Sequence, residues 1–416
     1  MPITRRHLMG QAAAAATLFA APVFARASAR VVVVGGGAGG MSAARRLMAG
    51  GASVTLIEQN PAYTACFLSN AAIGGLRPLS DFHFTYTQAA QAGLRVILAR
   101  VEAIDREAKI LHLSDGGKEP YDRLILSPGI DFVEGSVPGW SPADQALMPH
   151  AWKADPELAH LISQIDAMPE GGVFAMIAPP APYRCPPGPY ERVSMIAHRL
   201  SLQNPKAKIL IFDPKENYSK QTLFENAWTR LYPGMIERID PLMGGASVEV
   251  VPSEMRVIAD GEDFAVDVCN VIPAQRAGDL AAKAGLCDEG GWAPVEAGRF
   301  ISQLDPEVQI IGDACDQGAM PKSAYSASTQ ALLAAEALLG DLGLAPAAGT
   351  GLSNICYSLI APDEGLKVGG DYEVQAGRTV SLRNFISDPE EGPQELAATA
   401  REAEEWYARL TATMFG

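Results

Sequence analysis

Six cysteines are the residues of this chain with the widest chemical range, because a thiol can bind a metal, form a disulfide or act as a nucleophile. No two of them are three positions apart, so the chain has no zinc ribbon and no C-x-x-C-H haem attachment site. Six cysteines in 416 residues are also too few to replace a core by disulfides. We therefore expect no metal or haem on this chain and consider each thiol separately: Cys66, Cys185, Cys269, Cys287, Cys315 and Cys356.

A glycine-rich turn follows the first strong strand signal. Residues 30–34 contain four consecutive valines, which predict a buried parallel strand. The glycines directly after it, Gly35, Gly37 and Gly40, have the spacing G-x-G-x-x-G, which lets the backbone approach a pyrophosphate and a helix pack close to the sheet. The next strand ends at Glu58, whose carboxylate can accept hydrogen bonds from ribose hydroxyls. This order predicts a dinucleotide-binding domain.

Two later segments favour FAD over NAD as that dinucleotide. The segment that ends at Gly129 resembles the strand and turn that close the FAD domain of two-dinucleotide flavoproteins such as the disulfide reductases. Residues 308–313 resemble the second signature of that class, in which the Asp, here Asp313, contacts the ribityl chain. An alanine-rich helix expected directly after Lys322 would point its positive end at the flavin. We therefore expect Gly129, Asp313 and Lys322 to bind the cofactor.

The segment between these signatures, residues 143–268, has the strands of a second nucleotide-binding domain but not its glycines. Strands are expected at 172–178 and 208–213, and the turn after the first of them is rich in proline. Proline has no amide N–H to offer a phosphate. We therefore expect that the fold is kept, that the nicotinamide site is lost and that electrons do not enter from NAD(P)H.

The N-terminus has the features of an export signal. Arg5 and Arg6, a short apolar stretch and an A-x-A site that ends at Ala27 resemble a twin-arginine signal peptide, which predicts a periplasmic protein exported in its folded state. The stretch is shorter than the roughly 20 residues that span a bilayer, so no transmembrane segment is expected in the mature chain. Cleavage removes three Arg and no acid, which changes the formal charge from −15 to −18, or 30 minus 48. This acidity argues against a nucleic-acid partner.

Three of the cysteines lie where a flavin could meet them. Cys66 follows Glu58 in a loop expected to pass the dimethylbenzene end of the flavin, where it could form a thioether or be a small buried residue. Cys185 and Cys356 could form a disulfide that hydrosulfide attacks, a static disulfide or two unpaired core thiols. The other three have the pattern of structural residues: Cys269, Cys287 and Cys315.

Several segments together carry a resemblance to a known family. They are the G-x-G-x-x-G turn, Glu58, C-F-L-S-N from Cys66, Y-R-C-P-P-G-P-Y-E up to Glu191, Gly312-Asp313, Pro321-Lys322-Ser323 and N-x-C-Y around Cys356. This set resembles the flavoprotein subunit of flavocytochrome c sulfide dehydrogenase over essentially the whole mature chain. The resemblance implies FAD bound covalently through Cys66 and a redox disulfide between Cys185 and Cys356. It also implies a proton-handling role for Glu191 and a heterodimer with a separate c-type cytochrome subunit.

The predicted fold class is α/β, with two Rossmann-like domains of the disulfide-reductase kind and a C-terminal α+β interface domain. The predicted boundaries are 1–27 for the signal peptide, 28–142 and 269–345 for the FAD domain, 143–268 for the second domain and 346–416 for the C-terminal domain. Residues 394–415 have apolar side chains at helical spacing, which favours core or interface packing. We also consider a position for Trp406 near the flavin edge.

The resulting hypothesis is that HS⁻ attacks the Cys185–Cys356 disulfide and forms a persulfide, and that the liberated thiolate reduces FAD. Electrons then pass singly to the cytochrome, and sulfur leaves as sulfane sulfur or polysulfide. One alternative is a sulfide:quinone reductase, which the charged C-terminus disfavours. A second is an NADH-dependent disulfide or ferredoxin reductase, which the missing glycines disfavour. A third is a non-catalytic flavin-containing partner of a sulfur-oxidising complex, which would bind flavin without turning over sulfide.

Overall fold

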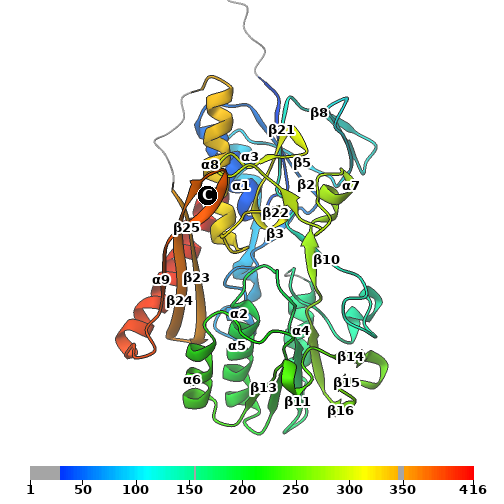
Figure 1. Cartoon of the computed structure of the whole chain (residues 1–416), viewed down its shortest axis with the longest axis vertical. Coiled ribbons are helices and arrows are strands. Elements are labelled where there is room, and N and C mark those ends of the chain that lie inside the picture. The colour runs from blue at the N-terminus through cyan, green and yellow to red at the C-terminus, as the bar shows by residue number, and fades with distance from the viewer. Residues whose placement is uncertain (1–28, 154–155, 345–350) are drawn as a thin grey trace, which may run out of the picture.

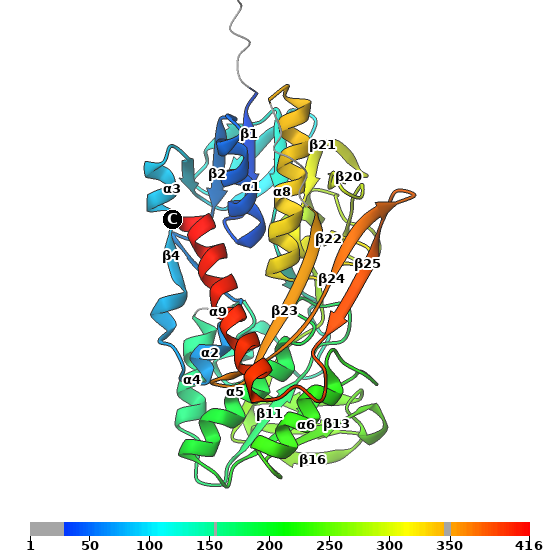
Figure 2. The same cartoon turned by 90° about the vertical axis from the view of Figure 1, so that its left-hand side faces the viewer.

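The computed structural model describes residues 29–153, 156–344 and 351–416 (Figure 1). The expected signal peptide, residues 1–27, lies outside these ranges. The described chain forms an upper lobe, a lower lobe and a C-terminal unit that packs along both of them (Figures 1 and 2).

The upper lobe is built on a six-stranded sheet in the order β20-β21-β9-β1-β2-β5. Its neighbours are parallel except for β20, which runs antiparallel to β21. The strands are β1 (Val31–Val34), β2 (Val54–Glu58), β5 (Arg95–Leu98), β9 (Arg123–Leu126), β20 (Ile301–Ser302) and β21 (Asp305–Ile310). Every β1 residue is buried, as the unbroken valine run predicts. The strands come from both ends of the predicted FAD domain, so this domain is assembled from two separated segments.

The lower lobe has a parallel sheet in the order β13-β12-β11-β17. Its strands are β11 (Val173–Ile177), β12 (Lys208–Phe212), β13 (Ile236–Ile239) and β17 (Val268–Val271). Its helices are α4 (Glu157–Asp166), α5 (Gly188–Gln203) and α6 (Gln221–Leu231), and a small antiparallel sheet adds β14 (Val248–Val251), β15 (Arg256–Ala259) and β16 (Glu262–Ala265). Because β17 pairs with β11, this lobe extends to at least residue 271, and the boundary that we predicted after residue 268 divides a strand.

The C-terminal unit is a three-stranded antiparallel sheet and one long helix. They are β23 (Leu352–Ala361), β24 (Glu364–Gln375), β25 (Arg378–Ile386) and α9 (Pro393–Phe415). In Figure 2, α9 runs from the lower lobe up to the elements of the upper lobe. It contacts β23 and β24 on one side and α1 (Ala38–Ala49) and α3 (Thr87–Gln91) on the other.

One long helix, α8, and several shorter elements complete the lobes. The remaining helices are α2 (Asn70–Ile73), α7 (Asp279–Lys283) and α8 (Ala324–Asp341). The remaining strands are β3 (Ala62–Thr64), β4 (His83–Thr85), β6 (Val101–Asp105), β7 (Ile110–Leu113), β8 (Lys118–Pro120), β10 (Ile130–Phe132), β18 (Gln275–Ala277), β19 (Ala293–Pro294) and β22 (Cys315–Asp316). The strand β10 lies where the chain enters the lower lobe, and β18 lies where it leaves. These two strands pair with each other.

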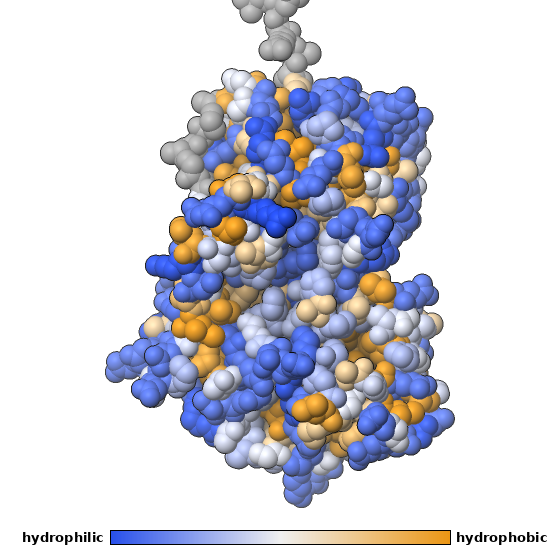
Figure 3. Space-filling view, in the orientation of Figure 1, coloured by the Kyte–Doolittle hydropathy of each residue, from blue (hydrophilic) through white to orange (hydrophobic). Residues whose placement is uncertain are grey.

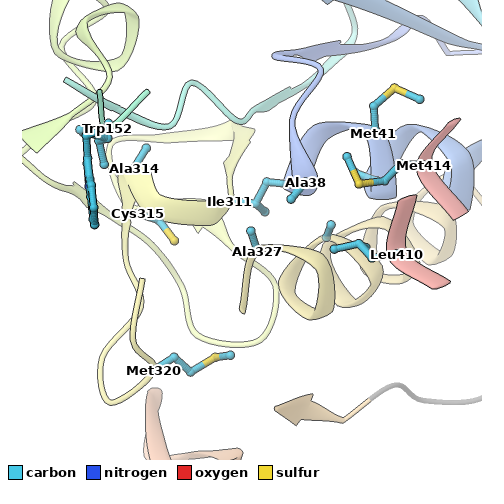
Figure 4. Packing of buried hydrophobic residues seen from close by; sticks show 14 of the residues in the cluster. Ala38, Met41, Trp152, Ile311, Ala314, Cys315, Met320, Ala327, Leu410 and Met414 are labelled. Carbon is cyan, nitrogen blue, oxygen red and sulfur yellow. The ribbon is translucent and has the colours of Figure 1, made fainter. Parts of the chain in front are cut away.

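The core of the upper lobe joins elements from both ends of the chain. Figure 4 shows Met41 of α1, Ala327 of α8 and Met414 of α9 in one buried cluster. Small side chains on α1 and α8 allow these two helices to lie in contact. The C-terminal helix is therefore part of the core that supports the glycine-rich turn.

The surface drawn in Figure 3 has small groups of apolar side chains separated by polar ones. Scattered apolar residues of this kind are normal on a protein surface. Within the described ranges, no helix combines the length and the hydrophobicity that a membrane span needs.

Candidate active site

A cavity of about 800 Å³ lies where the three parts of the chain meet. Its lining includes Gly35 and Cys66 of the upper lobe, Cys185 and Glu191 of the lower lobe, and Cys356 of the C-terminal unit. These residues are spread over more than 300 positions of sequence, and only the tertiary fold brings them together.

The glycine-rich turn forms one end of the cavity. The N–H of Gly36 donates a hydrogen bond of 2.6 Å to Oε2 of Glu58, so the acidic residue holds the turn as well as lining the cavity. Gly35 has a φ of +99°, and a Cβ on Gly40 would lie 1.8 Å from the Gly35 carbonyl oxygen. Gly40 itself does not line the cavity. Its predicted contribution, close packing of the helix on the turn, fits this geometry.

Asp313 also lines the cavity. Its Oδ1 is buried and has no hydrogen-bond partner among the described residues, and burial raises the pKa of its carboxyl group. A buried polar atom without a partner is unfavourable, and a ligand hydroxyl would satisfy it. Together with Gly129, which also lines the cavity at a φ of +67°, Asp313 fits the polyol chain of a flavin dinucleotide.

Lys322 has a different position from the one we predicted. It is not among the residues that line the cavity. Its Nζ donates hydrogen bonds to the carbonyl oxygens of Asp313 at 2.9 Å and Cys315 at 2.7 Å, and it lies over the Trp292 ring. In this structure Lys322 therefore holds the Asp313 loop, and its effect on a bound cofactor would be indirect.

Cys66 lies in the loop between β3 and α2 and is partly exposed to the cavity. The Ser69 hydroxyl and the Ser69 N–H both donate to the Cys66 carbonyl oxygen, at 2.7 and 3.3 Å, which fixes the loop locally. The thiol is thus held at the cavity wall without a disulfide partner. This position is compatible with the predicted thioether.

Cys185 and Cys356 reach the same cavity from different parts of the chain. Cys185 has a φ of +55°, and its N–H donates to the Lys322 carbonyl oxygen at 2.7 Å. Burial raises the pKa of both thiols, and the nearby Cys356 raises that of Cys185 further. Both are unbonded thiols in this structure, so the disulfide between them stays a prediction. Of the three cysteines predicted to be structural, two are fully buried and one is partly buried: Cys269, Cys315 and Cys287.

Asn354 connects Cys356 to the start of α8. The Ser323 hydroxyl donates to Asn354 Oδ1 at 2.6 Å, and Ser323 also caps α8 by accepting from the Ser326 N–H at 3.0 Å. With its oxygen fixed in this way, Asn354 directs Nδ2 to the Cys356 sulfur at 3.4 Å. This amide is a hydrogen-bond donor for a thiolate at Cys356.

Glu191 lies in the first turn of α5 and is 6% exposed. Its Oε2 accepts from Asn70 Nδ2 at 2.7 Å, and its Oε1 accepts from the Leu359 N–H at 2.9 Å. Burial raises the pKa of this carboxyl group, which brings its titration nearer to neutral pH. The geometry suits the predicted proton-handling role.

Two buried cations beside this site were missed by our sequence analysis. Arg192 lies over the Trp152 ring and donates to Asn70 Oδ1 at 3.2 Å, and burial lowers its pKa to about 9. Lys220 precedes α6 and donates to the Cys356 carbonyl oxygen at 3.0 Å. Neither cation belongs to a recognisable motif, and an isolated basic residue in a sequence usually indicates solvent exposure.

Trp406 also lines the cavity. Its ring stacks on that of Tyr325, with centroids 5.4 Å apart at 14°, and lies 5.3 Å from that of Phe67, the neighbour of Cys66. The apolar stripe of α9 is buried, in agreement with the predicted core packing, at Leu396, Ala400, Ala403, Tyr407, Leu410 and Met414.

A buried carboxylate lies at the end of β12 in the lower lobe. Asp213 has the position of the acidic residue that would bind a ribose, but it is fully buried. Its carboxylate pairs with Lys215 at 2.7 Å and Arg238 at 2.9 Å and accepts from the Tyr190 hydroxyl at 2.7 Å. These groups take up the hydrogen-bonding positions of the carboxylate, and the loss of a nicotinamide site stays a prediction.

The fold and the site define a class. Two Rossmann-like lobes, a glycine-rich turn and an additional C-terminal unit are the architecture of the flavin-dependent disulfide oxidoreductases, and the pyridine nucleotide-disulphide oxidoreductase family model matches residues 29–154. The model of the central part of the sulfide dehydrogenase [flavocytochrome c] flavoprotein chain matches residues 159–273. The flavin-binding model of flavocytochrome c sulphide dehydrogenase matches residues 350–415. The chain belongs to the family of flavocytochrome c sulfide dehydrogenase flavoprotein chains.

Solved structures agree with this fold. The chain is similar to the sulfide:quinone oxidoreductase of Aquifex aeolicus, with a TM-score of 0.67 and 16% identity over 92% of each chain. It is similar to a chain of the covalent putidaredoxin reductase-putidaredoxin complex, with a TM-score of 0.65 and 16% identity over 92% of this chain and 99% of that one. It is also similar to a NAD-dependent persulfide reductase from A. fulgidus, with a TM-score of 0.60 and 16% identity over 90% and 77%.

The similarities to solved structures establish the fold. The family matches support a flavoprotein oxidoreductase with FAD as its cofactor and a role in sulfide oxidation. Within the described ranges, no group of His, Cys, Asp and Glu is arranged to hold a metal ion.

Proposed function

We propose that this chain oxidises sulfide to sulfane sulfur or polysulfide in the periplasm and passes the electrons to a c-type cytochrome subunit. One observation carries the proposal: Cys66, Cys185 and Cys356, from three parts of the chain, line one cavity with the glycine-rich turn and Asp313. Three thiols that line one cavity match the three sulfur roles that the sequence predicts, one attachment point for the flavin and a redox pair.

The cofactor would be held mainly by the upper lobe. The turn from Gly35 to Gly37 would face the pyrophosphate, Glu58 the ribose and Asp313 the polyol chain. Cys66 would bind the ring covalently. Bound FAD supplies a group that accepts two electrons together and can release them one at a time to a one-electron carrier.

The residues of this chain would carry the sulfur chemistry. HS⁻ attacks one sulfur of a Cys185–Cys356 disulfide, so that a new S–S bond forms to the incoming sulfur and the cysteine–cysteine bond breaks. The products are a protein persulfide and a thiolate. Asn354 lies within reach of the Cys356 sulfur to donate a hydrogen bond, and Glu191 can hold a proton nearby because burial raises its pKa.

Replacement of Cys356 by Ser is the first test. A hydroxyl cannot form the disulfide, so we expect flavin reduction by sulfide to fall by at least three orders of magnitude while bound flavin is retained. Stopped-flow measurement of flavin absorbance checks this expectation. Cys287→Ser is the matched control, because Cys287 is partly buried and does not line the cavity. Rapid reduction of the Cys356→Ser flavin would exclude the disulfide mechanism.

The electron acceptor requires a separate experiment. A sulfide:quinone reductase has the same fold, as the Aquifex aeolicus structure shows. We expect cytochrome c to be reduced by sulfide and enzyme at least tenfold faster than a soluble quinone at equal concentration. Preference for the quinone would contradict the cytochrome proposal and favour that alternative.

A further inference from the structure

Lys220 is a buried amine that the proposed mechanism does not use. It is 4% exposed and precedes α6 with a φ of +64°, a left-handed conformation that is unfavourable for a residue with a side chain. The chain thus adopts an uncommon backbone geometry at the point where this side chain enters the interior.

Three hydrogen bonds join the Lys220 ammonium to the C-terminal sheet. Its Nζ donates to the carbonyl oxygen of Cys356 at 3.0 Å, to the Ser358 hydroxyl at 2.8 Å and to the carbonyl oxygen of Leu366 at 3.3 Å. These three acceptors are all uncharged oxygens, two of carbonyl groups and one of a hydroxyl. A buried ammonium with only neutral acceptors is costly, and burial lowers its pKa to about 8.

The titratable groups around Lys220 are those of the sulfur site. Cys356, Glu191 and Cys185 all favour its charged form, in that order. Conversely, the positive charge lowers the pKa of both thiols, against the larger effect of burial. Tyr372 of β24 also faces Cys356.

Further charged or titratable groups face Cys185 and Glu191. Cys66 and Arg184 interact with Cys185, and Arg192 interacts with both Cys185 and Glu191. Lys220 differs from these arginines because it binds the strand that carries Cys356.

We propose that Lys220 is a positioning residue that fixes the Cys356 strand against the lower lobe and supplies the positive charge that stabilises a thiolate at Cys356 when the cysteine pair opens. Only the use of this thiolate in sulfide turnover rests on the proposed function. In the sulfide step, one S–S bond forms and one breaks, and the negative charge of HS⁻ ends on a cysteine sulfur. The ammonium binds the hydroxyl of Ser358, which lies two positions after Cys356 on the same face of β23. Its fixed charge therefore acts on that sulfur in place of the water that a buried thiolate lacks.

The test measures the thiol directly, without sulfide. The flavin-bound protein is reduced with a phosphine and treated with iodoacetamide between pH 6 and 10, and the alkylation rate at Cys356 is followed by peptide mass spectrometry. Lys220→Gln keeps a hydrogen-bond donor and removes the charge, and Lys220→Met keeps the apolar stem. Lys206→Met is the matched control, because Lys206 is exposed and pairs only with Glu170 at the surface.

We expect the midpoint of the Cys356 profile to rise by about one pH unit or more in both Lys220 variants and to stay unchanged in Lys206→Met. Folding is checked by far-UV circular dichroism, because a covalently bound flavin would also stay with an unfolded chain. An unchanged midpoint in either folded Lys220 variant would overturn the proposal. If the midpoint shifts but sulfide fails to reduce wild-type flavin, the proposed function is wrong and the role of Lys220 as a thiolate-stabilising cation stands.

Discussion

At the scale of single residues, the site consists of groups whose chemistry depends on burial. Burial raises the pKa of the Cys185 and Cys356 thiols. A thiolate at Cys356 is therefore stable only with the hydrogen bond from Asn354 and the positive charge of Lys220. Cys66 lies in a half-buried loop at the cavity wall. By exposure Cys185 is also partly buried and Cys356 is buried, so the division into a redox pair and an attachment point stays a prediction that these positions permit.

The role of Cys66 leads to a prediction about denatured protein. If the thiol forms a thioether to the flavin, the flavin remains with the polypeptide after acid precipitation, and the Cys66 peptide gains the corresponding mass. Cys66→Ala should release its flavin on the same treatment. Visible absorbance of the pellet and peptide mass spectrometry provide the measurement. Free flavin from the wild-type protein would contradict covalent attachment.

At the scale of elements, the glycine-rich turn depends on the contact between α1 and β1. The Gly40 position has no room for a side chain because the Gly35 carbonyl oxygen would lie 1.8 Å from a Cβ. The turn is also held from outside by Glu58 and by Tyr86, whose hydroxyl donates to the Gly36 carbonyl oxygen at 3.3 Å. The cofactor site is thus fixed by a helix, two strands and one loop.

Gly40→Ala should therefore displace the turn and reduce FAD affinity. We expect at least tenfold weaker flavin retention in a variant that also lacks Cys66, and a loss of about 1–3 kcal/mol in the free energy of unfolding. Gly340→Ala is the control, because a Cβ there meets no atom within 4 Å and alanine favours a helix. Fluorescence of released flavin and urea unfolding measure both effects. Equal retention in the two variants would contradict this account of the turn.

At the scale of the whole molecule, the site exists only where three parts meet. The upper lobe supplies the turn, the lower lobe supplies Cys185 and Glu191, and the C-terminal sheet supplies Cys356. A polar network at this junction holds the parts together. Glu191 of the lower lobe accepts from Asn70 Nδ2 of the upper lobe at 2.7 Å and from the Leu359 N–H of the C-terminal sheet at 2.9 Å. Its neighbour Arg192 donates to Asn70 Oδ1 and to the His150 carbonyl oxygen, both at 3.2 Å. Stability and site geometry are therefore linked.

His150 belongs to this network, and its burial leads us to expect that the protein becomes less stable to unfolding at acid pH. Burial lowers the pKa of its imidazole to about 3, with help from nearby Lys153 and Arg192, and its Nδ1 accepts from the Trp152 N–H. The unfolded chain then binds a proton near pH 6.5 and the folded chain does not, so stability is present above pH 6.5 and falls as the pH decreases toward 3. Between pH 7 and 5 this residue should account for a loss of about 2 kcal/mol.

The measurement is urea unfolding at pH 7 and pH 5 for the wild type and His150→Gln. The variant is expected to lose about 2 kcal/mol less than the wild type over this interval, whatever its stability at pH 7. His160→Gln, at a more exposed position, is the control. An equal loss in wild type and His150→Gln would show that His150 is not held neutral in the folded protein.

The sequence by itself determined the parts of this protein that depend on short segments. The valine strand, the glycine spacing, Glu58 and the amphipathic C-terminal helix are local patterns, because strand burial, turn geometry and helix periodicity involve neighbouring residues. The segments that carry the resemblance also indicated the family and the three cysteines that line the cavity.

Only the tertiary structure decided what surrounds those residues. Lys322 turns away to the carbonyl oxygens of its own loop, β17 joins the lower lobe, and Lys220 reaches the Cys356 strand from 136 positions away. Burial and long-range hydrogen bonds fix these positions, and neither leaves a periodic signal in the chain. The charge that a buried sulfur experiences is a property of the folded neighbourhood, which no local pattern encodes.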